Sequence, residues 1–257
     1  MCKLSIITVN KNNAEGLRKT IESIINQKYI DFEYIVIDGN SNDNSISIIK
    51  EHLDNIDFWI SEPDAGIYNA MNKGVGKAKG EYILFLNSGD CFADAQVLFD
   101  VFSLNPIEDF IIGRSVMIGE KIKIKTLFSV KNTFHNLFYT TIHHQATFAK
   151  RSVFEEIGLF DESFTLAADF KVFITSVVIY GKTYKAIENT VAIVEPGGIS
   201  AGCQTVNKIK SEKNRILKEC FPYFYDDYIE LHRITRFRRI KQYLIWRFDL
   251  LFQSRKK

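Results

Sequence analysis

Residues 80–90 read GEYILFLNSGD, and this stretch decides how we interpret the fold of the chain. Its centre, Tyr82–Leu86, is apolar throughout and has the length of a buried strand. The strand pattern stops abruptly in a small polar turn that ends in Asp90. In open α/β sheets, ligands bind beyond the carboxyl ends of the strands. The stretch therefore predicts a central strand with a functional turn at its end.

The residues before this stretch alternate between strand and helix patterns. Short apolar runs predict strands at Leu4–Val9, Phe32–Ile37 and Phe58–Ile60. Helical spacing predicts helices between them, at Ala14–Asn26, Asn44–Leu53 and Gly66–Ala78. Strands that alternate with helices of this length predict a mostly parallel sheet flanked by helices, the Rossmann-like class of α/β fold.

The chain changes character after this alternating part. Residues 109–150 hold short apolar runs with few helical signals, which predicts antiparallel or mixed strands that extend the sheet. Further helices are expected at 151–157, at about 168–180 and at about 204–219, with a strand at 184–188. We expect one catalytic domain over residues 1–220 and a basic helical tail over 221–257.

The composition is that of a soluble globular protein, with 46% apolar and 25% charged residues among 257. The four cysteines are scattered and lack metal-ligand spacing, which predicts reduced thiols and a cytoplasmic protein. The apolar run near the N-terminus is too short for a signal peptide. We see no apolar run long enough to predict a spanning helix.

The end of the chain is strongly basic. Residues 228–257 hold nine Lys or Arg against two acids, a net charge of +7, which leaves −5 for the rest of a chain whose total is +2. Apolar and basic residues there follow helical spacing, which is typical of a helix lying on an anionic membrane surface. The alternative is a helix packed on the catalytic domain with solvated arginines. We expect no nucleic-acid partner, because no reader motif is present.

Polar residues follow all four predicted strands of the first part. Asn10, Asp38, Asp64 and Asp90 each lie just past the end of a strand, so they should converge at one edge of the sheet. Each alone could be a turn or helix-capping residue. The four together favour a ligand site. Asp90 suits Mn²⁺ or Mg²⁺ bound to a diphosphate, because such a cation needs only one or two carboxylates; its alternative is a cap for the next helix.

Six segments carry a resemblance to a known family. They are 5–10 (SIITVN), 36–43 (VIDGNSND), 61–74 (SEPDAGIYNAMNKG), 80–90, 144–148 (HQATF) and 167–170 (AADF). In this order and at these spacings, over roughly residues 3–202, the chain resembles family-2 glycosyltransferases of the GT-A fold. The resemblance is to the branch that builds bacterial surface polysaccharides such as O-antigen, capsule or exopolysaccharide.

The resemblance implies a metal-dependent, inverting hexosyltransferase. It implies a nucleotide-sugar donor, with UDP as the expected nucleotide, and an acceptor hydroxyl on a saccharide linked to polyprenyl diphosphate. A protein that uses such an acceptor is expected in the cytoplasm, peripheral on the inner face of the membrane.

The same resemblance implies roles for individual residues. Thr8, Asn10, Asp38 and Asp64 would line the nucleotide pocket, with Asp38 hydrogen-bonding the base, and Asp90 would hold the metal. The chain departs from the family pattern beside Asp90, where Asn87 and Gly89 stand at positions that are acidic in the family. The missing acids bear on two properties, the affinity for the metal and the contact with the ribose. Asn87 remains a candidate for the ribose contact.

Three further features are implied beyond the donor pocket. Asp169 resembles the general base that takes the proton of the acceptor hydroxyl; its alternative role is a helix cap. His144 and Gln145 are candidates to contact the acceptor or the metal, with a core or surface role as the alternative. Gly197, Gly198 and Ser200 resemble a loop that closes over the diphosphate, and an ordinary turn is the alternative.

Other functions fit the residues less well. A nucleotidyltransferase of related fold would need a glycine-rich basic loop after the first strand, and residues 10–13 (NKNN) lack glycine. A catalytically silent nucleotide-binding or scaffold subunit of a polysaccharide assembly complex stays open, supported by the reduced number of acids beside Asp90.

Overall fold

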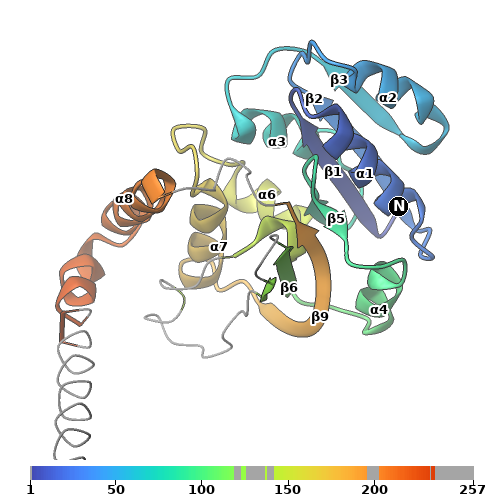
Figure 1. The fold of residues 1–257 in the computed structure, drawn as a ribbon. Helices are drawn as coiled ribbons and strands as arrows, with labels where there is room; N and C mark the ends of the chain where they lie inside the picture. The colour runs from blue at the N-terminus through green and yellow to red at the C-terminus, as the bar shows by residue number, and fades with distance from the viewer. Residues whose placement is uncertain are drawn as a thin grey trace, which may run out of the picture. The chain divides into compact units, whose positions relative to one another are not determined.

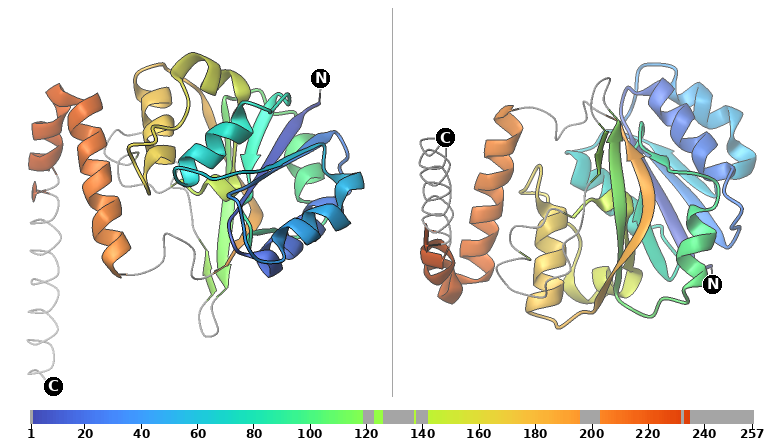
Figure 2. Two further views of the ribbon diagram at one scale, coloured as in Figure 1. Left: turned by 90° about the horizontal axis from the view of Figure 1, so that it is seen from above. Right: turned by 60° about the horizontal axis from the view of Figure 1, so that its bottom comes forward.

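A computed structural model of the chain describes residues 2–118, 123–125, 137, 142–195, 203–231 and 233–234. The chain divides into two compact units, Met1–Glu212 and Lys213–Lys257. The first unit is an α/β structure in which one sheet carries helices on both faces (Figures 1 and 2). The expected α/β class is thereby confirmed, whereas the expected domain boundary at residue 220 stays a prediction.

The first half of the sheet is parallel. The strands are β1 (Leu4–Asn10), β2 (Phe32–Asp38), β3 (Phe58–Ser61) and β4 (Tyr82–Phe85), in the order β3-β2-β1-β4. Helices α1 (Ala14–Ile25), α2 (Ser45–Glu51) and α3 (Ile67–Val75) and the 3-10 turn η1 (Leu53–Asn55) connect them. Asn10 pairs with Asp38 and Asp38 with Ser61, so three strand ends lie level at one edge.

The second half of the sheet is mixed. Its strands are β5 (Cys91–Phe92), β6 (Phe110–Ile118), β7 (Lys123–Lys125), β8 (Thr147–Lys150) and β9 (Tyr184–Val194). β8 is antiparallel to both β4 and β6, and β9 is parallel to β6. This confirms the mixed strands expected over 109–150. The strand expected at 184–188 extends to Val194, because its later residues keep pairing with β6 and with β5.

Further helical elements are α4 (Val97–Ser103), η2 (His144–Ala146), α6 (Arg151–Ile157), α7 (Ala168–Val178) and α8 (Cys203–Cys220). Helices α1, α2 and α4 cover one face of the sheet, and α3, α6 and α7 cover the other (Figure 2). Strand β4 serves both cores. Leu84 packs under α1 and α4, while the ring of Phe85 lies 5.4 Å from that of Phe160 on the other face.

Helix α3 lies unusually close to β1. A Cβ atom added to Gly74 would stand 2.5 Å from Cγ2 of Ile7, so only glycine allows this approach. The close packing places the start of α3, including Tyr68, beside the edge where the strands end.

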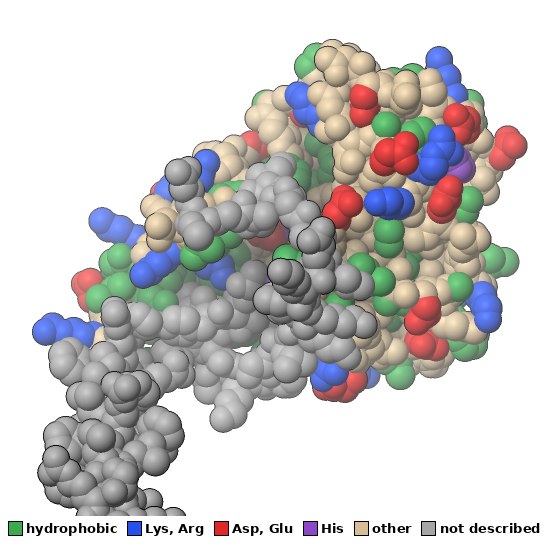
Figure 3. Space-filling model, viewed as in Figure 1, with side chains coloured by type: hydrophobic (Ala, Val, Ile, Leu, Met, Phe, Trp, Pro, Cys, Tyr) green, Lys and Arg blue, Asp and Glu red, His purple; other side chains and the backbone are tan. Residues whose placement is uncertain are grey.

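The surface over α1 and α2 carries acidic and basic side chains next to one another (Figure 3). Arg18 and Glu51 form an ion pair between these helices at 2.8 Å. The part of the chain that the structure describes has no helix of the length and hydropathy needed to cross a membrane.

Candidate active site

The ends of β1, β2 and β3 form one hydrogen-bonded cluster around Asp38. This residue is fully buried. Its Oδ1 accepts hydrogen bonds from Asn10 Nδ2 (2.8 Å) and Ser41 Oγ (2.6 Å). Its Oδ2 accepts from the Ser41 backbone N–H (2.9 Å) and from Ser61 Oγ (2.6 Å). The expected convergence of Asn10 and Asp38 is present, and the carboxylate is saturated by the protein itself.

Asp64 lies at the rim of this cluster. A Cβ atom on Gly39 would stand 2.8 Å from Asp64 Oδ2, so the two loops after β2 and β3 meet there. Lys73 Nζ lies 2.6 Å from Asp64 Oδ1 and 2.8 Å from the carboxylate of Glu62. This lysine offsets the negative charge at the rim.

Thr8 is in the core beneath the edge rather than at its surface. Its side chain is fully buried, and its Oγ1 donates to the Leu86 carbonyl at 2.7 Å and accepts from the Tyr34 hydroxyl at 3.0 Å. Thr8 therefore ties β1 to the residue that precedes the polar turn after β4.

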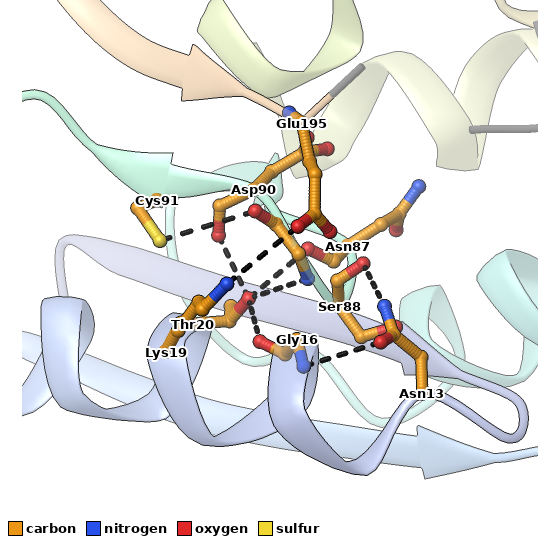
Figure 4. Close-up of polar contacts among 10 residues, drawn as sticks. Asn13, Gly16, Lys19, Thr20, Asn87, Ser88, Asp90, Cys91 and Glu195 are labelled. Atoms are coloured by element: carbon orange, nitrogen blue, oxygen red, sulfur yellow. Dashed lines mark hydrogen bonds and ion pairs between the residues drawn. The ribbon is translucent and has the colours of Figure 1, made fainter. Parts of the chain in front are cut away.

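That turn is held from below by α1, as Figure 4 shows. Thr20 Oγ1 accepts from the Gly89 backbone N–H (3.0 Å) and lies 2.7 Å from the Asp90 carbonyl, to which it can donate. Asn13 Nδ2 donates to the Ser88 carbonyl at 3.1 Å. Gly89 has φ +101°, a conformation that favours glycine, so the sharp turn itself accounts for glycine at this position.

Asp90 is buried at the end of the turn. Its Oδ1 accepts from the Glu195 backbone N–H at 3.3 Å. Burial raises the pKa of the Asp90 carboxyl above its ordinary value, against the lowering effects of nearby His144 and of a hydrogen bond from Gln145. The carboxylate of Glu195 adds a smaller raising effect on the pKa. Asp90 is thus a buried carboxyl whose ionised form is stabilised by a neighbouring positive charge.

Asp169 lies in the first turn of α7. Its Oδ1 accepts from the Phe170 backbone N–H (2.8 Å) and from the Tyr68 hydroxyl (3.2 Å). Burial and the charge of Asp169 raise the pKa of Tyr68, which keeps that hydroxyl protonated as a donor. Oδ2 lies 3.4 Å from Nδ1 of His144.

His144 connects the two parts of the site. Its Nε2 lies 3.0 Å from Asn87 Nδ2, while its Nδ1 faces Asp169. The side chains of His144 and Asp169 are 21% and 18% exposed, so both reach the surface of the site. The structure brings together Asn87, Asp90, His144, Gln145 and Asp169. Gly197, Gly198 and Ser200 lie outside the described residues.

The loop before Asp169 is held by a residue far along the chain. Glu212, on α8, accepts hydrogen bonds from the backbone N–H groups of Thr165, Leu166 and Ala167 at 2.9–3.3 Å. Although burial raises the pKa of Glu212, these hydrogen bonds and one from the Thr165 hydroxyl bring it below its ordinary value. The loop that leads into α7 is therefore held by Glu212.

Several of these residues were missed by sequence reasoning. They are Thr20, Ser41, Ser61, Tyr68, Glu195 and Glu212. Ser41, Ser61 and Tyr68 lie inside the quoted segments, so their place in the segments was the available signal. Thr20 is on the buried face of an amphipathic helix, and no pattern distinguishes it there from a core residue.

A divalent cation fits the donor atoms of the turn. Among the described residues there is no group of three or more His, Cys, Asp or Glu side chains that could hold a metal. Asp90 offers one carboxylate, and Asn87 Oδ1 is a buried oxygen without a hydrogen-bond partner in the described part of the chain. One carboxylate and hard oxygen donors suit Mg²⁺ or Mn²⁺ when phosphate oxygens and water complete its coordination. The residues fit a cation that arrives with a diphosphate.

Comparison with known proteins identifies the family of the chain. Residues 5–157 match the model of the family described as Glycosyl transferase family 2. The chain is 32% identical over 173 residues to an uncharacterized glycosyltransferase of Mycobacterium tuberculosis, with 65% of each protein covered. It is 28% identical over 198 residues to the poly(ribitol-phosphate) beta-N-acetylglucosaminyltransferase TarP of Staphylococcus aureus, covering 72% of this chain and 60% of TarP. The chain thus spans just under two thirds of the length of the curated relatives it matches.

Solved structures share the fold. S. aureus TarS 1–349 in complex with UDP-GlcNAc superposes with a TM-score of 0.66 at 15% identity, covering 87% of this chain and 73% of TarS. The mannosyltransferase PcManGT of Pyrobaculum calidifontis, in complex with GDP-Man and Mn²⁺, gives 0.62 at 16% identity, covering 88% and 68%. At these identities the likeness establishes the fold alone.

Proposed function

The chain belongs to glycosyltransferase family 2, and on that premise we propose that it transfers a sugar from a nucleotide-sugar to an acceptor hydroxyl with inversion at the anomeric carbon. One observation carries the proposal: the turn that holds Asp90 and the carboxylate of Asp169 are 79 residues apart in the sequence, yet both reach His144. A donor on the turn and an acceptor on Asp169 would therefore meet.

On the donor side, Asp90 would hold Mn²⁺ or Mg²⁺, and Asn87 would contact the cation or the ribose. A bound cation of this kind neutralises charge that grows on the leaving diphosphate. Asn10, Asp38 and Asp64 would line the nucleotide pocket. Because Asp38 is saturated, its contact with the base requires a hydroxyl such as that of Ser41 to turn away.

Thr8 would support this pocket from beneath, through its bond to the Leu86 carbonyl. Gly197, Gly198 and Ser200 would close over the diphosphate.

On the acceptor side, Asp169 would act as the general base. Tyr68 and the backbone of Phe170 both donate to Oδ1, which leaves Oδ2 to take a proton. As the acceptor oxygen attacks the anomeric carbon, its proton passes to Oδ2 and the bond to the diphosphate oxygen breaks. A single in-line displacement of this kind inverts the sugar and needs no covalent intermediate.

The substrates are proposed from the relatives. A UDP-sugar is favoured because TarS is seen with UDP-GlcNAc, and metal dependence because PcManGT is seen with Mn²⁺. TarP acts on poly(ribitol-phosphate), which supports a role in a bacterial surface polysaccharide. We propose a saccharide on polyprenyl diphosphate as the acceptor, reached from the cytoplasmic face of the membrane.

The decisive experiment is thermal stability of the purified protein with UDP, GDP, CDP and dTDP, each with and without Mn²⁺. A ligand at about 100 times its dissociation constant stabilises a protein by roughly 2.7 kcal/mol, which shifts the midpoint visibly. A shift with one nucleotide that requires the metal supports the proposal and names the donor class. Absence of any shift would favour a silent scaffold subunit instead.

The tail has a separate test. If residues 228–257 lie on an anionic membrane, deleting them should release the protein from vesicles that contain anionic lipid. The deletion removes about 1 kcal/mol of membrane-binding free energy per basic residue. The full chain should sediment with anionic vesicles and remain in solution with neutral ones. A truncated protein that still sediments would assign membrane binding to another part of the chain.

A further inference from the structure

His144 stands between the donor-side turn and the base, and it contacts both. Its two ring nitrogens lie 3.0 Å from Asn87 Nδ2 and 3.4 Å from Asp169 Oδ2. The residue begins η2, which leads directly into β8, and β8 pairs with β4, the strand that ends two residues before Asn87. We propose that His144 is a positioning residue that couples the donor-side turn to Asp169 and orients that carboxylate toward the acceptor.

The hydrogen bonds of His144 have a defined direction. An amide nitrogen only donates, so Asn87 Nδ2 occupies the lone pair of Nε2, and a neutral ring then carries its proton on Nδ1. With the amide turned so that Oδ1 faced the ring, Nε2 would need a proton, and Nδ1 would need one as well to face the carboxylate of Asp169. In both arrangements Nδ1 donates to Asp169 Oδ2.

This arrangement gives His144 a different role from a metal ligand. A metal binds the lone pair of a neutral imidazole nitrogen. In His144, Nε2 is directed at Asn87 and Nδ1 at Asp169, so both nitrogens are engaged within the protein. The direct contact with metal or acceptor, which sequence reasoning left open for this residue, is therefore the less favoured interpretation.

Through Asn87, donor binding can affect the orientation of the Asp169 carboxylate. Its Oδ1 is buried without a hydrogen-bond partner in the described residues. A cation or a ribose hydroxyl that satisfies Oδ1 would hold the amide with Nδ2 toward His144. Tyr68 and Phe170 fix the other oxygen of Asp169, so His144 controls the remaining rotation of that carboxylate. This inference rests on the proposed function, since it assumes a donor at the turn and a base at Asp169.

Two substitutions test the role through the rate of nucleotide release. The probe is the nucleotide-sugar that the stability screen selects, with water as the acceptor, so no saccharide acceptor has to be known. His144→Phe keeps a planar ring and removes both hydrogen bonds, whereas His144→Gln keeps a donor and an acceptor. We expect His144→Phe to lower kcat about 100-fold, as for a reacting group displaced by about 1 Å, with the donor KM within about threefold of the wild type. His144→Gln should recover most of the loss.

A double-mutant cycle separates positioning from other roles. In an Asp169→Asn background, His144→Phe should have no further effect on kcat, because the group that it positions has lost its function. Equal losses in both backgrounds would overturn the proposal, as would an unchanged kcat or a loss confined to Mn²⁺–nucleotide binding. His52→Gln is the matched control, because His52 Nδ1 contacts the carbonyl of Ile48 in the last turn of α2, and the variant should behave as the wild type.

A spectroscopic readout needs no activity. In the ¹⁵N-histidine spectrum of the intact protein, the signals that His144→Gln removes should show a protonated Nδ1. An Nδ1 without a proton would overturn the proposal, whatever the rates are. If the wild type neither binds nucleotide nor releases it, the proposed function itself fails; if the wild type is active and His144→Phe equally so, only the role of His144 fails.

Discussion

Asp38 and Asp169 are both carboxylates at the same edge of the sheet, and their surroundings differ in kind. Asp38 is fully buried, and four hydrogen bonds from Asn10, Ser41 and Ser61 saturate it. Asp169 is 18% exposed, and His144, at 3.4 Å, is the one donor that the structure shows on its Oδ2.

The difference separates a carboxylate that holds the strand ends together from one that can accept a proton. A saturated, buried carboxylate contributes to stability. Removing it costs much of that stability, because its buried hydrogen-bond donors are left without an acceptor. A partly exposed group with an open lone pair can serve a reaction. The two regions should therefore respond to mutation in opposite ways, one in stability and the other in rate.

The largest effect is expected at Asp169. Asp169→Asn keeps the shape of the side chain and removes the base, so transfer should fall about 1000-fold, within the range for general base catalysis. Nucleotide binding and the thermal midpoint should hardly change. The control is Asp161→Asn, since Asp161 is a carboxylate that forms an ion pair with Lys171, on the same helix as Asp169. Wild-type turnover by Asp169→Asn would show that Asp169 does not accept the proton, and the contrast with Asp38 would no longer hold.

The counterpart is a loss of stability at Asp38. Asp38→Ala leaves two serine hydroxyls, an amide and a backbone N–H without their acceptor, which should cost about 3 kcal/mol of unfolding free energy. Urea denaturation followed by circular dichroism measures this cost. Ser41→Ala, which removes a single donor, should cost about 1 kcal/mol. Equal stability of Asp38→Ala and the wild type would show that the cluster does not hold the edge.

Asp90 should combine both kinds of response. Asp90→Asn should weaken Mn²⁺-dependent nucleotide binding by at least about tenfold, the lower limit seen even for outer-shell partners of a metal, as isothermal titration calorimetry can measure.

The pH dependence of stability gives a second measurement on the same variant. The pKa of Asp90 is raised in the folded chain from its ordinary value of 3.8, so the wild type loses stability as the pH rises through the window above 3.8. Asp90→Asn removes that loss. Without metal, the variant should be more stable than the wild type at pH 7, and the advantage should disappear below pH 3.8. A wild type more stable than the variant at pH 7 would contradict the expected direction of the stability change.

The smallest effect is expected at Thr20, which anchors the turn from α1. Thr20→Val keeps the shape and removes the hydroxyl, at a cost of about 1 kcal/mol in stability. Nucleotide affinity should fall slightly, because the Gly89 and Asp90 backbone loses its support. Thr20→Ser retains the hydroxyl and should restore both quantities. A Thr20→Val protein as stable as the wild type would show that the turn does not depend on α1.

The sequence predicted the strand ends better than the contacts between them. Strand and helix periods are local, so the sequence alone predicted β1 to β4 and the position of Asn10, Asp38, Asp64 and Asp90 at or beyond their ends. What each side chain contacts depends on partners far along the chain. The saturation of Asp38 by Ser61 and the burial of Thr8 depend on strand register, which no single segment encodes.

The second half of the site was predicted from resemblance alone. Asp169 was identified by its segment, but its contact with Tyr68 spans 101 residues and that with His144 spans 25. Glu212 supports the same loop from more than 40 residues away. Such pairings depend on tertiary packing, and packing is a property of the whole chain.

The hydrogen-bonded series Asn87–His144–Asp169 also has an order in time. During synthesis Asn87 leaves the ribosome first, His144 follows 57 residues later, and Asp169 another 25 residues after that. At ordinary translation rates this interval is roughly 4–16 s. The parallel strands β1 to β4 can pair during that interval, before Asp169 has been made. A growing chain can therefore possess the edge proposed to bind the donor well before it possesses the proposed base.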